Sequence, residues 1–543
     1  MRLRKALGSM ASLAREFAAL LGFCFLMHLP ATSTAAVPGD SGLTAFRAVT
    51  TNLDGSGIHV AQPEASLTTN LLTFEVNPTN VPQPALSYVY TTFTGTTDSF
   101  PNALGVESSH ADTVGGIFYG IPFGVATNVA NVDNFEADYF YSNYLSDPTL
   151  PDIGDQVVNQ SFTFGPLSAS DQESLDSDYD NYAVQNQTLF VSAANNFGNN
   201  PVVCAPGTDY NCISVGAYAN GTYVNSIGPT SDNGRCKPDL TAIGGATSFS
   251  TPLVAGAATV LMQAGLRGDG GRDPGGATDF RTIKAVLLNG AVKPPDWTNS
   301  TASPLDARYG SGVMNVLNAY EQLAGGEHAF LSGTRVPIGS PHPPDNRPGQ
   351  IAALSGWDFN TNTSAANFDA INHYYFQPVS GGGAGAWTVT ATLVWNRQLG
   401  ESNINQLSLF LYDCARSNLV ACSTSLVDNV QHLYVPRLSP GRYDLQVWKA
   451  GGIAGSNIVS DAETYALAWA LVSPKLLLTR SGTNLLLEWP VYPNGMVLES
   501  ATNLPWSTWT TNILPAPTIT NGQYCLPINP ANPVQLFRLT AKP

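Results

Sequence analysis

The amino-acid sequence predicts an α/β domain with a doubly wound parallel sheet, followed by two all-β modules. Two observations lead to this prediction. Between about residues 43 and 325, short apolar runs alternate with helical patterns, which is typical of a parallel sheet covered by helices on both faces. After residue 357 the helical pattern ends, and apolar residues alternate with polar ones as they do in a β-sandwich.

The elements of the first region are predicted from apolar runs and helical periodicity. The expected buried strands are Ile58–Ala61, Val157–Ser161, Leu189–Ala194 and Ile213–Tyr218, and the expected helices are Gln172–Gln185 and Phe249–Ala264. Residues 326–356 are rich in Pro and Gly, which predicts a linker.

The two all-β modules are predicted at residues 357–473 and 474–543. The strands expected in the first are Trp387–Trp395, Leu407–Tyr412, Val430–Val435, Tyr443–Trp448 and Tyr465–Leu471. Those expected in the second, smaller module are Leu476–Leu478, Leu485–Trp489, Met496–Glu499 and Phe537–Leu539.

Residues 1–36 have the three parts of a secretory signal peptide. Four basic residues precede an apolar run, Phe17–Leu29, and the small residues Ser33–Ala36 follow it. The run of 13 residues is too short for a membrane span, which needs about 20. We therefore expect an exported protein, extracellular or periplasmic, that has no membrane association once the leader is removed.

The net charge limits the classes of molecule that the protein is expected to bind. The net charge of the 543 residues is −16, and removal of the leader, which carries +3, leaves a mature chain near −19. There is no basic cluster, so binding to nucleic acid or to an anionic membrane surface is not expected.

Six cysteines remain after Cys24 leaves with the leader. The pairs Cys204/Cys212 and Cys414/Cys422 each flank a short loop, so we expect two local disulfides in an oxidising compartment. Cys236 and Cys525 are left over as buried thiols. No spacing of Cys or His indicates a metal site.

One segment has the features of a nucleophile site. Gly244-Gly245 precede Thr-Ser-Phe-Ser-Thr-Pro-Leu-Val-Ala-Gly at residues 247–256, which puts Ser248 in the first turn of a predicted helix. The unpaired N–H groups of a helix start can stabilise an oxyanion beside such a serine. The alternative is an ordinary serine at a helix N-terminus, which is common.

This segment resembles the nucleophile motif of the subtilisin-like serine peptidases (subtilases), Gly-Thr-Ser-x-Ala/Ser-x-Pro-x-Val-Ala-Gly. Ten consecutive positions fit, and Ala246 replaces the usual glycine. The segment is not a Gly-x-Ser-x-Gly elbow, which argues against an α/β-hydrolase. The resemblance covers about residues 45–325, and it implies a subtilisin-like fold and hydrolysis of polypeptide substrates through an acyl-enzyme.

A serine nucleophile needs a base, and only His59 and His110 lie between the leader and Ser248. His59 falls within a strand pattern and is expected to be a surface residue. His110 lies at the helix start Ser109–Gly116, after the expected cap Ser109, in a segment that resembles the family's His-Gly-Thr-His-Val-Ala-Gly. His110 is therefore the expected base.

The expected orienting acid is Glu64. Residues 55–64 resemble the family's strand pattern Gly-x-Gly-Val-x-Val-Ala-Val-Ile-Asp, with Glu64 in the place of the aspartate. A glutamate can also orient an imidazole. Asp54 and Asp112 are the weaker alternatives, and Glu64 could instead be a solvated carboxylate at a strand end.

The resemblance implies further site residues. Val191–Gly198 is similar to the family's Ala-Ala-Gly-Asn-x-Gly, which makes Asn196 the oxyanion donor and puts Asn195 in place of a pocket glycine. The segment after Val157–Gln160 resembles the strand that holds the substrate backbone, so Ser161, Phe162 and Thr163 are expected to bind substrate. Thr163 and Phe164 replace a usual Gly-Gly pair, which predicts a narrower cleft. Residues 308–315 look like the family's closing element.

Two other functions are compatible with parts of the sequence. A sedolisin-like acid peptidase needs Ser, Glu and Asp, but no Glu-x-x-x-Asp pair occurs near His110, and Asn196 stands where an aspartate is required. A catalytically impaired subtilase could serve as a peptide-binding or surface-interaction module, because Thr163, Phe164, Asn195 and Ala246 depart from the motifs.

No cofactor is expected. Calcium is implied by the resemblance alone, because acidic loops such as Asp176–Asp180 form no defined ligand set. Only 27 residues separate Ala36 from Glu64, which predicts folding without a chaperone-like propeptide or with help from the C-terminal modules.

Overall fold

The computed structural model describes residues 41–541 apart from short gaps. The gaps are 67–71, 83–87, 93–94, 98–99, 101–105, 197–201, 346, 380–386, 453–458, 474–475, 482–483, 491–495, 503–508, 512–516, 521–522 and 529–534. The predicted signal peptide lies outside the described residues.

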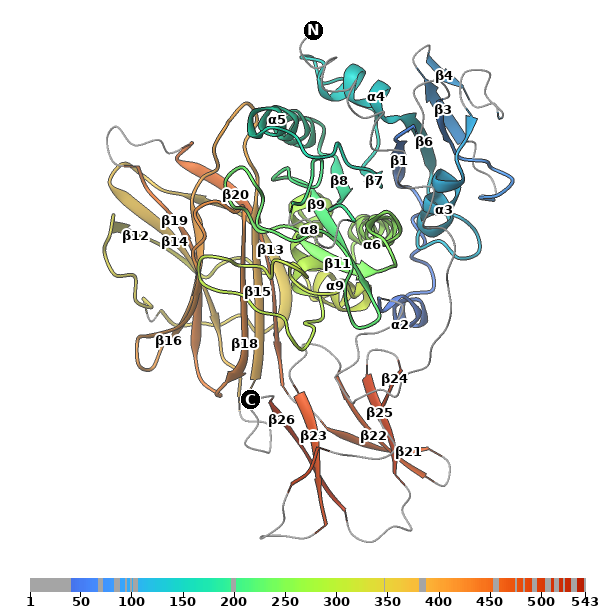
Figure 1. Cartoon of the computed structure of the whole chain (residues 1–543). Coiled ribbons are helices and arrows are strands. Elements are labelled where there is room, and N and C mark those ends of the chain that lie inside the picture. The colour runs from blue at the N-terminus through green and yellow to red at the C-terminus, as the bar shows by residue number, and fades with distance from the viewer. Residues whose placement is uncertain are drawn as a thin grey trace.

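A mainly parallel sheet forms the centre of the α/β domain (Figure 1). Its strands, in spatial order, are β10 (Thr222–Tyr223), β9 (Ile213–Ala219), β8 (Leu189–Ala193), β7 (Val157–Gln160), β1 (His59–Glu64), β6 (Asn131–Glu136), β3 (Tyr88–Thr92) and β4 (Gly95–Thr97). Strand β11 (Leu240–Ile243) also pairs with β9, in parallel. Only β10 and β4 run antiparallel to their neighbours among these described strands, so the predicted parallel sheet is confirmed.

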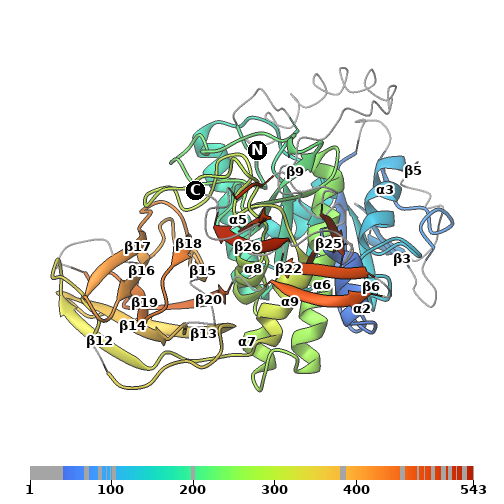
Figure 2. The ribbon, with the colours of Figure 1, turned by 90° about the horizontal axis from the view of Figure 1, so that it is seen from below.

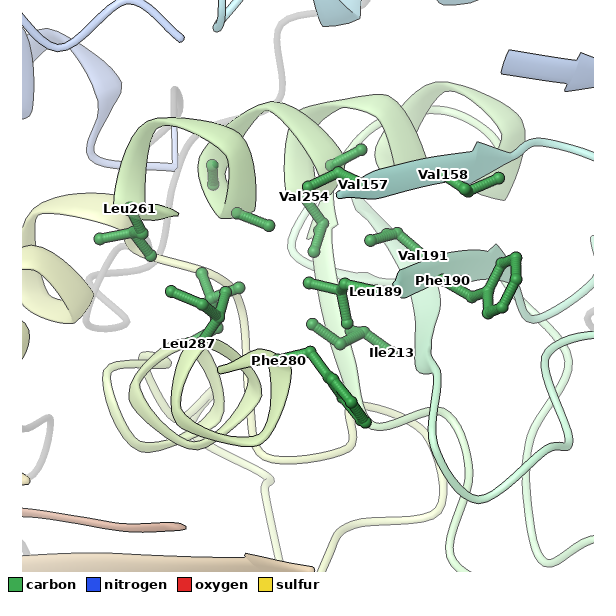
Figure 3. Packing of buried hydrophobic residues seen from close by; sticks show 14 of the residues in the cluster. Val157, Val158, Leu189, Phe190, Val191, Ile213, Val254, Leu261, Phe280 and Leu287 are labelled. Atoms are coloured by element: carbon green, nitrogen blue, oxygen red, sulfur yellow. The ribbon is translucent and has the colours of Figure 1, made fainter. Parts of the chain in front are cut away.

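The helix that begins with the serine motif, α6 (Thr247–Arg267), is the core helix of this domain. It packs on β7, β8 and β9 and against α3 (Ser109–Phe118). Figure 3 shows Val254 of α6 beside Leu189 and Ile213 of the sheet, with Leu287 of α8 (Phe280–Asn289) close to them. Among the described helices, α6 alone has the length and apolarity of a membrane span, but most of its apolar window is buried in this core.

The other described helices of this domain are shorter or lie toward its surface. They are α2 (Leu43–Val49), α4 (Ala137–Phe140), the π-helix η3 (Tyr141–Leu145), α5 (Ala169–Asn186), α7 (Pro274–Thr278) and α9 (Val316–Ala324). Helix α5 begins at the cap Ser168, whose Oγ accepts a hydrogen bond from Asp171 N.

The first β-sandwich consists of two antiparallel sheets. One sheet has the order β12 (Ser332–Pro337), β14 (Phe368–Phe376), β19 (Tyr443–Lys449), β16 (Leu407–Asp413) and β17 (Asn418–Ser423). The other has the order β13 (Ser355–Thr363), β20 (Ala462–Val472), β15 (Trp387–Trp395) and β18 (Val430–Leu438).

The C-terminal module is also antiparallel. A four-stranded sheet contains β21 (Leu477–Ser481), β22 (Asn484–Pro490), β25 (Gln523–Ile528) and β24 (Thr518–Thr520), and a two-stranded sheet contains β23 (Met496–Ala501) and β26 (Leu536–Ala541). The predicted all-β character of both modules is confirmed.

The sandwich packs directly on the α/β domain through its four-stranded sheet (Figures 1 and 2). Strands β15 and β20 contact α8, and β13 contacts α9. Five sandwich residues belong to the same buried apolar cluster as the α/β domain: Trp357, Val394, Val430, Ala466 and Ala468. The two predicted units therefore share a buried apolar interface, while the sandwich has a second core of its own between its two sheets.

Two predictions differ from the structure. The segment 326–356, predicted as a linker, contains β12, which pairs with β14 and so belongs to the sandwich. The predicted disulfides are wrong, since Cys204, Cys212, Cys414 and Cys422 are all free thiols. In the second pair, the register sets Cys422 opposite Phe410, four residues before Cys414. In the first pair, Cys204 Sγ accepts a hydrogen bond from Asn195 Nδ2.

Candidate active site

Glu64 and His110 meet at one end of the sheet. Glu64 is the last residue of β1 and is buried, with 2% of its surface exposed. His110 is the second residue of α3, which is capped by Ser108 rather than by the predicted Ser109, because Ser108 Oγ accepts a hydrogen bond from Ala111 N. The Nδ1 atom of His110 lies 2.5 Å from Oε1 of Glu64. The acid expected from the strand pattern is thus in hydrogen-bond contact with the expected base.

This contact changes the proton affinity of His110. Burial by itself lowers the pKa of the imidazole, but the charge of Glu64 and the hydrogen bond to it act in the opposite direction. The net result is a pKa raised above the ordinary value of 6.5. An imidazole paired in this way is fixed in orientation and is a stronger base than a free histidine.

Ser248 lies in the first turn of α6, a helix that packs against α3, which bears His110. The ring of Phe249, the next residue, has its centroid 6.1 Å from that of His110. Gly244 allows this tight entry into the helix, because a Cβ there would lie 2.4 Å from Ser250 Oγ. The Oγ atom of Ser248 donates a hydrogen bond to the carbonyl oxygen of Ser161 over 3.0 Å.

No hydrogen bond joins Ser248 Oγ to His110 within the part of the chain that the structure describes. Catalytic contacts of this kind are often long in the absence of substrate and shorten in the complex. A rotation of the Ser248 side chain away from the Ser161 carbonyl is therefore the step that would complete the arrangement.

Asn196 is held beside Ser248 by the residue before it. Its Oδ1 atom accepts hydrogen bonds from the backbone N–H of Thr247, over 2.7 Å, and from Thr247 Oγ1, over 2.8 Å. Both bonds use the carbonyl end of the amide, so the Nδ2 end remains to donate to another group. This is the orientation that an oxyanion donor needs.

Asn195 occupies the position at which the family has glycine. Its backbone conformation shows how a non-glycine residue fits there. Its φ angle is 90°, in the left-handed region that asparagine tolerates better than most residues. Its side chain is fixed at both ends: Oδ1 accepts from Asn196 N over 2.7 Å, and Nδ2 donates to Cys204 Sγ over 3.1 Å.

The segment Ser161–Thr163 follows β7 directly. Strand β7 pairs with β1 on one side and β8 on the other, so its own edges are occupied. Ser161 Oγ donates to the carbonyl oxygen of Ser248 over 3.0 Å, which ties this segment to α6. In the described structure, Phe162 and Thr163 form no backbone–backbone hydrogen bond. Their backbone groups are thus not engaged by other backbone groups of the described residues.

Phe164 does not extend from this segment into solvent. Its ring is buried against Tyr141, with centroids 5.9 Å apart, and its N–H donates to the carbonyl oxygen of Ala205. Phe162 and Thr163 are the half-buried residues of the segment.

The other candidate acids and the second histidine lie elsewhere. Asp112 accepts hydrogen bonds from Asn77 N and Asn80 Nδ2, and Asp54 accepts one from Ser56 N. His59 is exposed at the start of β1, as expected.

Sequence reasoning missed two supporting residues, Thr247 and Gln62. Gln62 Nε2 donates to the carbonyl oxygen of Ala111 over 3.0 Å and lies 3.5 Å from Glu64 Oε2, so Gln62 connects β1 to α3 beside the acid. The alternation of strand residues sets Gln62 and Glu64 on the same face of β1, which is the signal that could have identified it.

The described residues do not fit a metal site. They contain no group of three or more His, Cys, Asp or Glu side chains able to hold an ion. Asp176 and Asp180 lie on helix α5, not in a loop, and their carboxylates are engaged with Arg235 and Arg397.

A model of a known protein family matches part of this chain. The subtilase family model matches residues 129–312, which include Asn196 and Ser248 but begin after Glu64 and His110. No curated protein matches the chain.

Several solved structures are similar. The prenylagaramide maturation protease PagA is 19% identical, over 53% of this chain and 100% of that chain, with a TM-score of 0.35. The PatG macrocyclase in complex with a peptide is 15% identical, over 54% and 97%, with a TM-score of 0.34. A cold-adapted subtilisin-like serine proteinase is 20% identical, over 49% and 89%, with a TM-score of 0.30. From the family match, the chain contains a domain of the subtilase family of serine peptidases at residues 129–312.

Proposed function

We propose that this chain is an exported serine endopeptidase that hydrolyses peptide bonds through an acyl-enzyme. The observation that carries the proposal is the 2.5 Å contact between Glu64 Oε1 and His110 Nδ1, next to the helix start that bears Ser248. The two residues come from different elements and lie 46 positions apart in the chain, so local sequence does not bring them together.

The mechanism follows from the roles of these atoms. Ser248 Oγ attacks the carbonyl carbon of the scissile bond while His110 Nε2 takes the hydroxyl proton. Glu64 accepts the Nδ1–H hydrogen bond and stabilises the imidazolium that forms. The new oxyanion receives hydrogen bonds from Asn196 Nδ2 and from the backbone N–H of Ser248.

Collapse of this intermediate breaks the C–N bond. His110 then gives its proton to the leaving amine, which departs as the free amino end of one product. A water molecule deprotonated by His110 attacks the acyl-enzyme, releases the carboxylate product and restores Ser248.

Polypeptides are the substrates that fit the segment Ser161–Thr163 beside Ser248. An extended chain can pair with the backbone groups of Phe162 and Thr163, in the manner of an added β-strand. Ser161 and Asn195 would flank the residue whose carbonyl is attacked, because both are tied to the Ser248–Asn196 pair by hydrogen bonds.

A second function is favoured by one observation. The Ser248 hydroxyl is engaged with the Ser161 carbonyl, so an impaired subtilase could bind peptides without cleaving them. The two functions are separated by a fluorophosphonate probe, which reacts only with an activated serine.

The test uses the full-length mature chain. We expect one covalent adduct on Ser248 by mass spectrometry, loss of the adduct and of casein hydrolysis in Ser248→Ala, and an unchanged melting temperature. Ser250→Ala is the matched control, because Ser250 Oγ donates to the carbonyl oxygen of Ala242 inside the domain and should not affect labelling. Hydrolysis by Ser248→Ala within tenfold of wild type would contradict the proposal.

Export is tested separately. When the chain is expressed with its own N-terminus in a secreting host, we expect the protein outside the cytoplasm to begin near Val37. Retention of residues 1–36 on the recovered protein would rule out the signal-peptide assignment.

A further inference from the structure

The outer face of the five-stranded sheet in the first β-sandwich has an unusual composition. This sheet lies on the side of the sandwich away from α8 and α9 (Figure 1). Leu409 and Leu411 of β16 and Leu445 and Val447 of β19 point into the buried core. The residues between them therefore point outward. They are Ser408, Phe410 and Tyr412 on β16, and Asp444, Gln446 and Trp448 on β19.

Four of these side chains have a buried polar atom without a hydrogen-bond partner in the described structure. The atoms are Ser408 Oγ, Asp444 Oδ1, Gln446 Oε1 and Trp448 Nε1. Ser408, Asp444 and Gln446 have no exposed surface. Buried polar groups are nearly always paired in proteins, and each exception needs an explanation, such as a bound molecule.

The four atoms belong to neighbouring positions of one sheet. Ser408 is opposite Trp448, and Tyr412 is opposite Asp444. Gln446 lies between Asp444 and Trp448 on the same face of β19, because strand side chains alternate. The group is thus a single polar cluster and not four separate defects.

The carboxylate and the amide of this cluster are held in fixed orientations. Asp444 Oδ2 is 2.8 Å from His373 Nδ1, and it also accepts a hydrogen bond from Gln446 Nε2 over 2.8 Å. Gln446 Nε2 donates in addition to the carbonyl oxygen of His342 over 3.1 Å. The unpartnered oxygens are therefore at the ends of side chains that are already positioned, as in a preorganised site.

Aromatic rings lie beside the polar cluster. The rings of Phe410 and Tyr412 are inclined by only 28°, with centroids 6.4 Å apart, and both residues are half-buried. His342 approaches them nearly edge-on, 4.5 Å from Phe410 and 6.2 Å from Tyr412, and stacks on Trp448 at 6.0 Å. The imidazole of His342 thus covers a group of three aromatic rings, in which the Trp448 ring stands at 88° to the Phe410 ring.

His342 comes from the Pro-rich segment between β12 and β13. The segment is attached to the sheet through Asp345, which accepts hydrogen bonds from Ser332 Oγ, over 2.8 Å, and from the Tyr375 hydroxyl. Near His342 the segment is attached through the Gln446 bond and a long contact of 3.4 Å between His342 Nδ1 and the Tyr412 hydroxyl. We call residues 340–345 the cover segment.

We propose that this face binds a neutral saccharide, and that the cover segment moves aside when the saccharide binds. The cluster offers two acceptor oxygens, one N–H donor and one hydroxyl, next to the half-buried and nearly parallel rings of Phe410 and Tyr412. Sugar hydroxyls donate to Asp444 Oδ1 and Gln446 Oε1 and accept from Trp448 Nε1, and the C–H face of the sugar ring packs on Phe410 and Tyr412.

The same hydrogen-bonding groups and aromatic rings disfavour other classes of ligand. An anion would be repelled by the Asp444 carboxylate. A peptide strand would pair with the backbone of a sheet edge, whereas β16 and β19 have neighbours on both sides. The proposal is independent of the catalytic function, because it concerns residues of the sandwich only.

The test measures binding of saccharides to the full-length mature chain. Insoluble cellulose, chitin and xylan are used in pull-downs, and cellohexaose, chitohexaose and xylohexaose in calorimetry and tryptophan-fluorescence titrations. We expect at least one of the three saccharides to bind.

Variants locate the binding. Trp448→Phe keeps the ring and removes the N–H donor, and it should weaken binding about tenfold, the effect of one lost hydrogen bond. Tyr412→Ala should weaken it at least as much. His342→Ala should strengthen it, because the rings of Phe410 and Tyr412 are then uncovered. Trp509→Phe, in the C-terminal module, is the matched control and should bind as wild type does.

Three results would overturn the proposal. They are the absence of binding by both wild type and His342→Ala, binding that Trp448→Phe and Tyr412→Ala leave unchanged, and displacement of the saccharide by gelatin peptides that bind more tightly to the same residues. Weaker binding by His342→Ala would overturn the role of the cover segment. Trp448→Phe keeps the test valid if Tyr412→Ala fails to fold.

Discussion

Arg397 of the first β-sandwich donates a hydrogen bond from Nη1 to Oε1 of Glu173 on helix α5, over 2.6 Å. Only 1% of the Arg397 side chain is exposed, and its Nε atom lies 2.7 Å from a second carboxylate of α5, on Asp180. Its backbone is fixed as well: Arg397 N donates to Asn211 Oδ1, and Asn211 Nδ2 donates to the carbonyl oxygen of Arg397. A buried charge with two partners in the α/β domain couples the sandwich to that domain.

This coupling leads to a prediction about truncation. A chain ending after Gly325 should fail to fold, because it exposes the apolar surface of α8 and leaves Glu173 and Asp180 without Arg397. A chain ending after Ser473 should fold and react with the fluorophosphonate probe. Soluble yield, circular dichroism and labelling check both. A folded, labelled 37–325 fragment would show that the apolar interface with the sandwich is dispensable.

The buried arginine can be tested alone. Arg397→Ala should lower the free energy of unfolding by about 3–5 kcal/mol, the usual cost of leaving a buried charge without its partner. The control is Arg416→Ala, which removes an exposed ion pair with Asp413 and should change stability by less than about 0.5 kcal/mol. Urea unfolding of both variants provides the comparison, and equal effects would contradict the prediction.

Much of the fold could be predicted because a buried strand is recognisable in the sequence as a run of apolar residues. The run Val157–Ser161 matches β7 to within one residue, and Trp387–Trp395 matches β15 at both ends. A strand with many polar residues has no such run and could not be predicted in this way. Strand β6 reads Asn-Val-Asp-Asn-Phe-Glu, and it is stabilised by pairing with β1 and β3, which only the folded chain reveals.

Part of the candidate site could be predicted because some of its residues lie in local sequence motifs. A local motif identified Ser248, but the role of Thr247 in fixing Asn196 depends on a contact between residues 51 positions apart. The predicted disulfides failed because the spacing of cysteines does not define strand register. The strand pattern indicated that Glu64 lies at the end of a strand, but its contact with His110 joins residues 46 positions apart and depends on the folded chain.

The anchoring of Asn196 gives a prediction on turnover. Asn196→Ala should reduce kcat by about 10²–10³ with a smaller effect on KM, the usual result of removing one oxyanion donor. Thr247→Val keeps the backbone N–H bond to Asn196 Oδ1 and removes only the hydroxyl bond, so a loss of about tenfold is expected. Steady-state kinetics on a peptide ester measure both, and a normal kcat for Asn196→Ala would exclude it from the oxyanion site.

Glu136 gives a prediction on the pH dependence of stability. Burial raises the pKa of this carboxyl from 4.5 to about 7, outweighing the hydrogen bond it accepts from Tyr139 N. The folded state therefore holds a proton that the unfolded chain releases between pH 4.5 and 7. Over this range the free energy of unfolding falls as pH rises, by about 3 kcal/mol from this residue.

Glu136→Gln should remove this contribution. Denaturant unfolding between pH 4.5 and 7 should then give a flatter profile than wild type, while the exposed control Glu401→Gln keeps the wild-type profile. An unchanged slope in Glu136→Gln would mean that the carboxyl is ionised in the folded protein.

The raised pKa of His110 predicts the pH dependence of activity. The reaction needs the neutral imidazole, so kcat/KM should rise with pH along a limb whose midpoint lies above 6.5. In Glu64→Gln the attraction of the carboxylate is lost while burial remains, so the limb should move to lower pH. A limb at the same pH in both proteins would show that Glu64 does not act on the essential base.

The Glu64 variants test the least expected residue of the site. Glu64→Gln keeps the shape of the side chain, but its amide can favour the wrong tautomer of His110, and such a change costs about 10⁴ in turnover in a well-studied triad. Glu64→Asp keeps the charge but draws the carboxylate back by one methylene from a contact now 2.5 Å long, so we expect an intermediate rate. Asp112→Asn is the control, because Asp112 is bonded to Asn77 and Asn80 and should acylate normally. Single-turnover acylation at neutral pH orders the three variants. Normal acylation by Glu64→Gln together with loss in Asp112→Asn would reassign the orienting acid to Asp112.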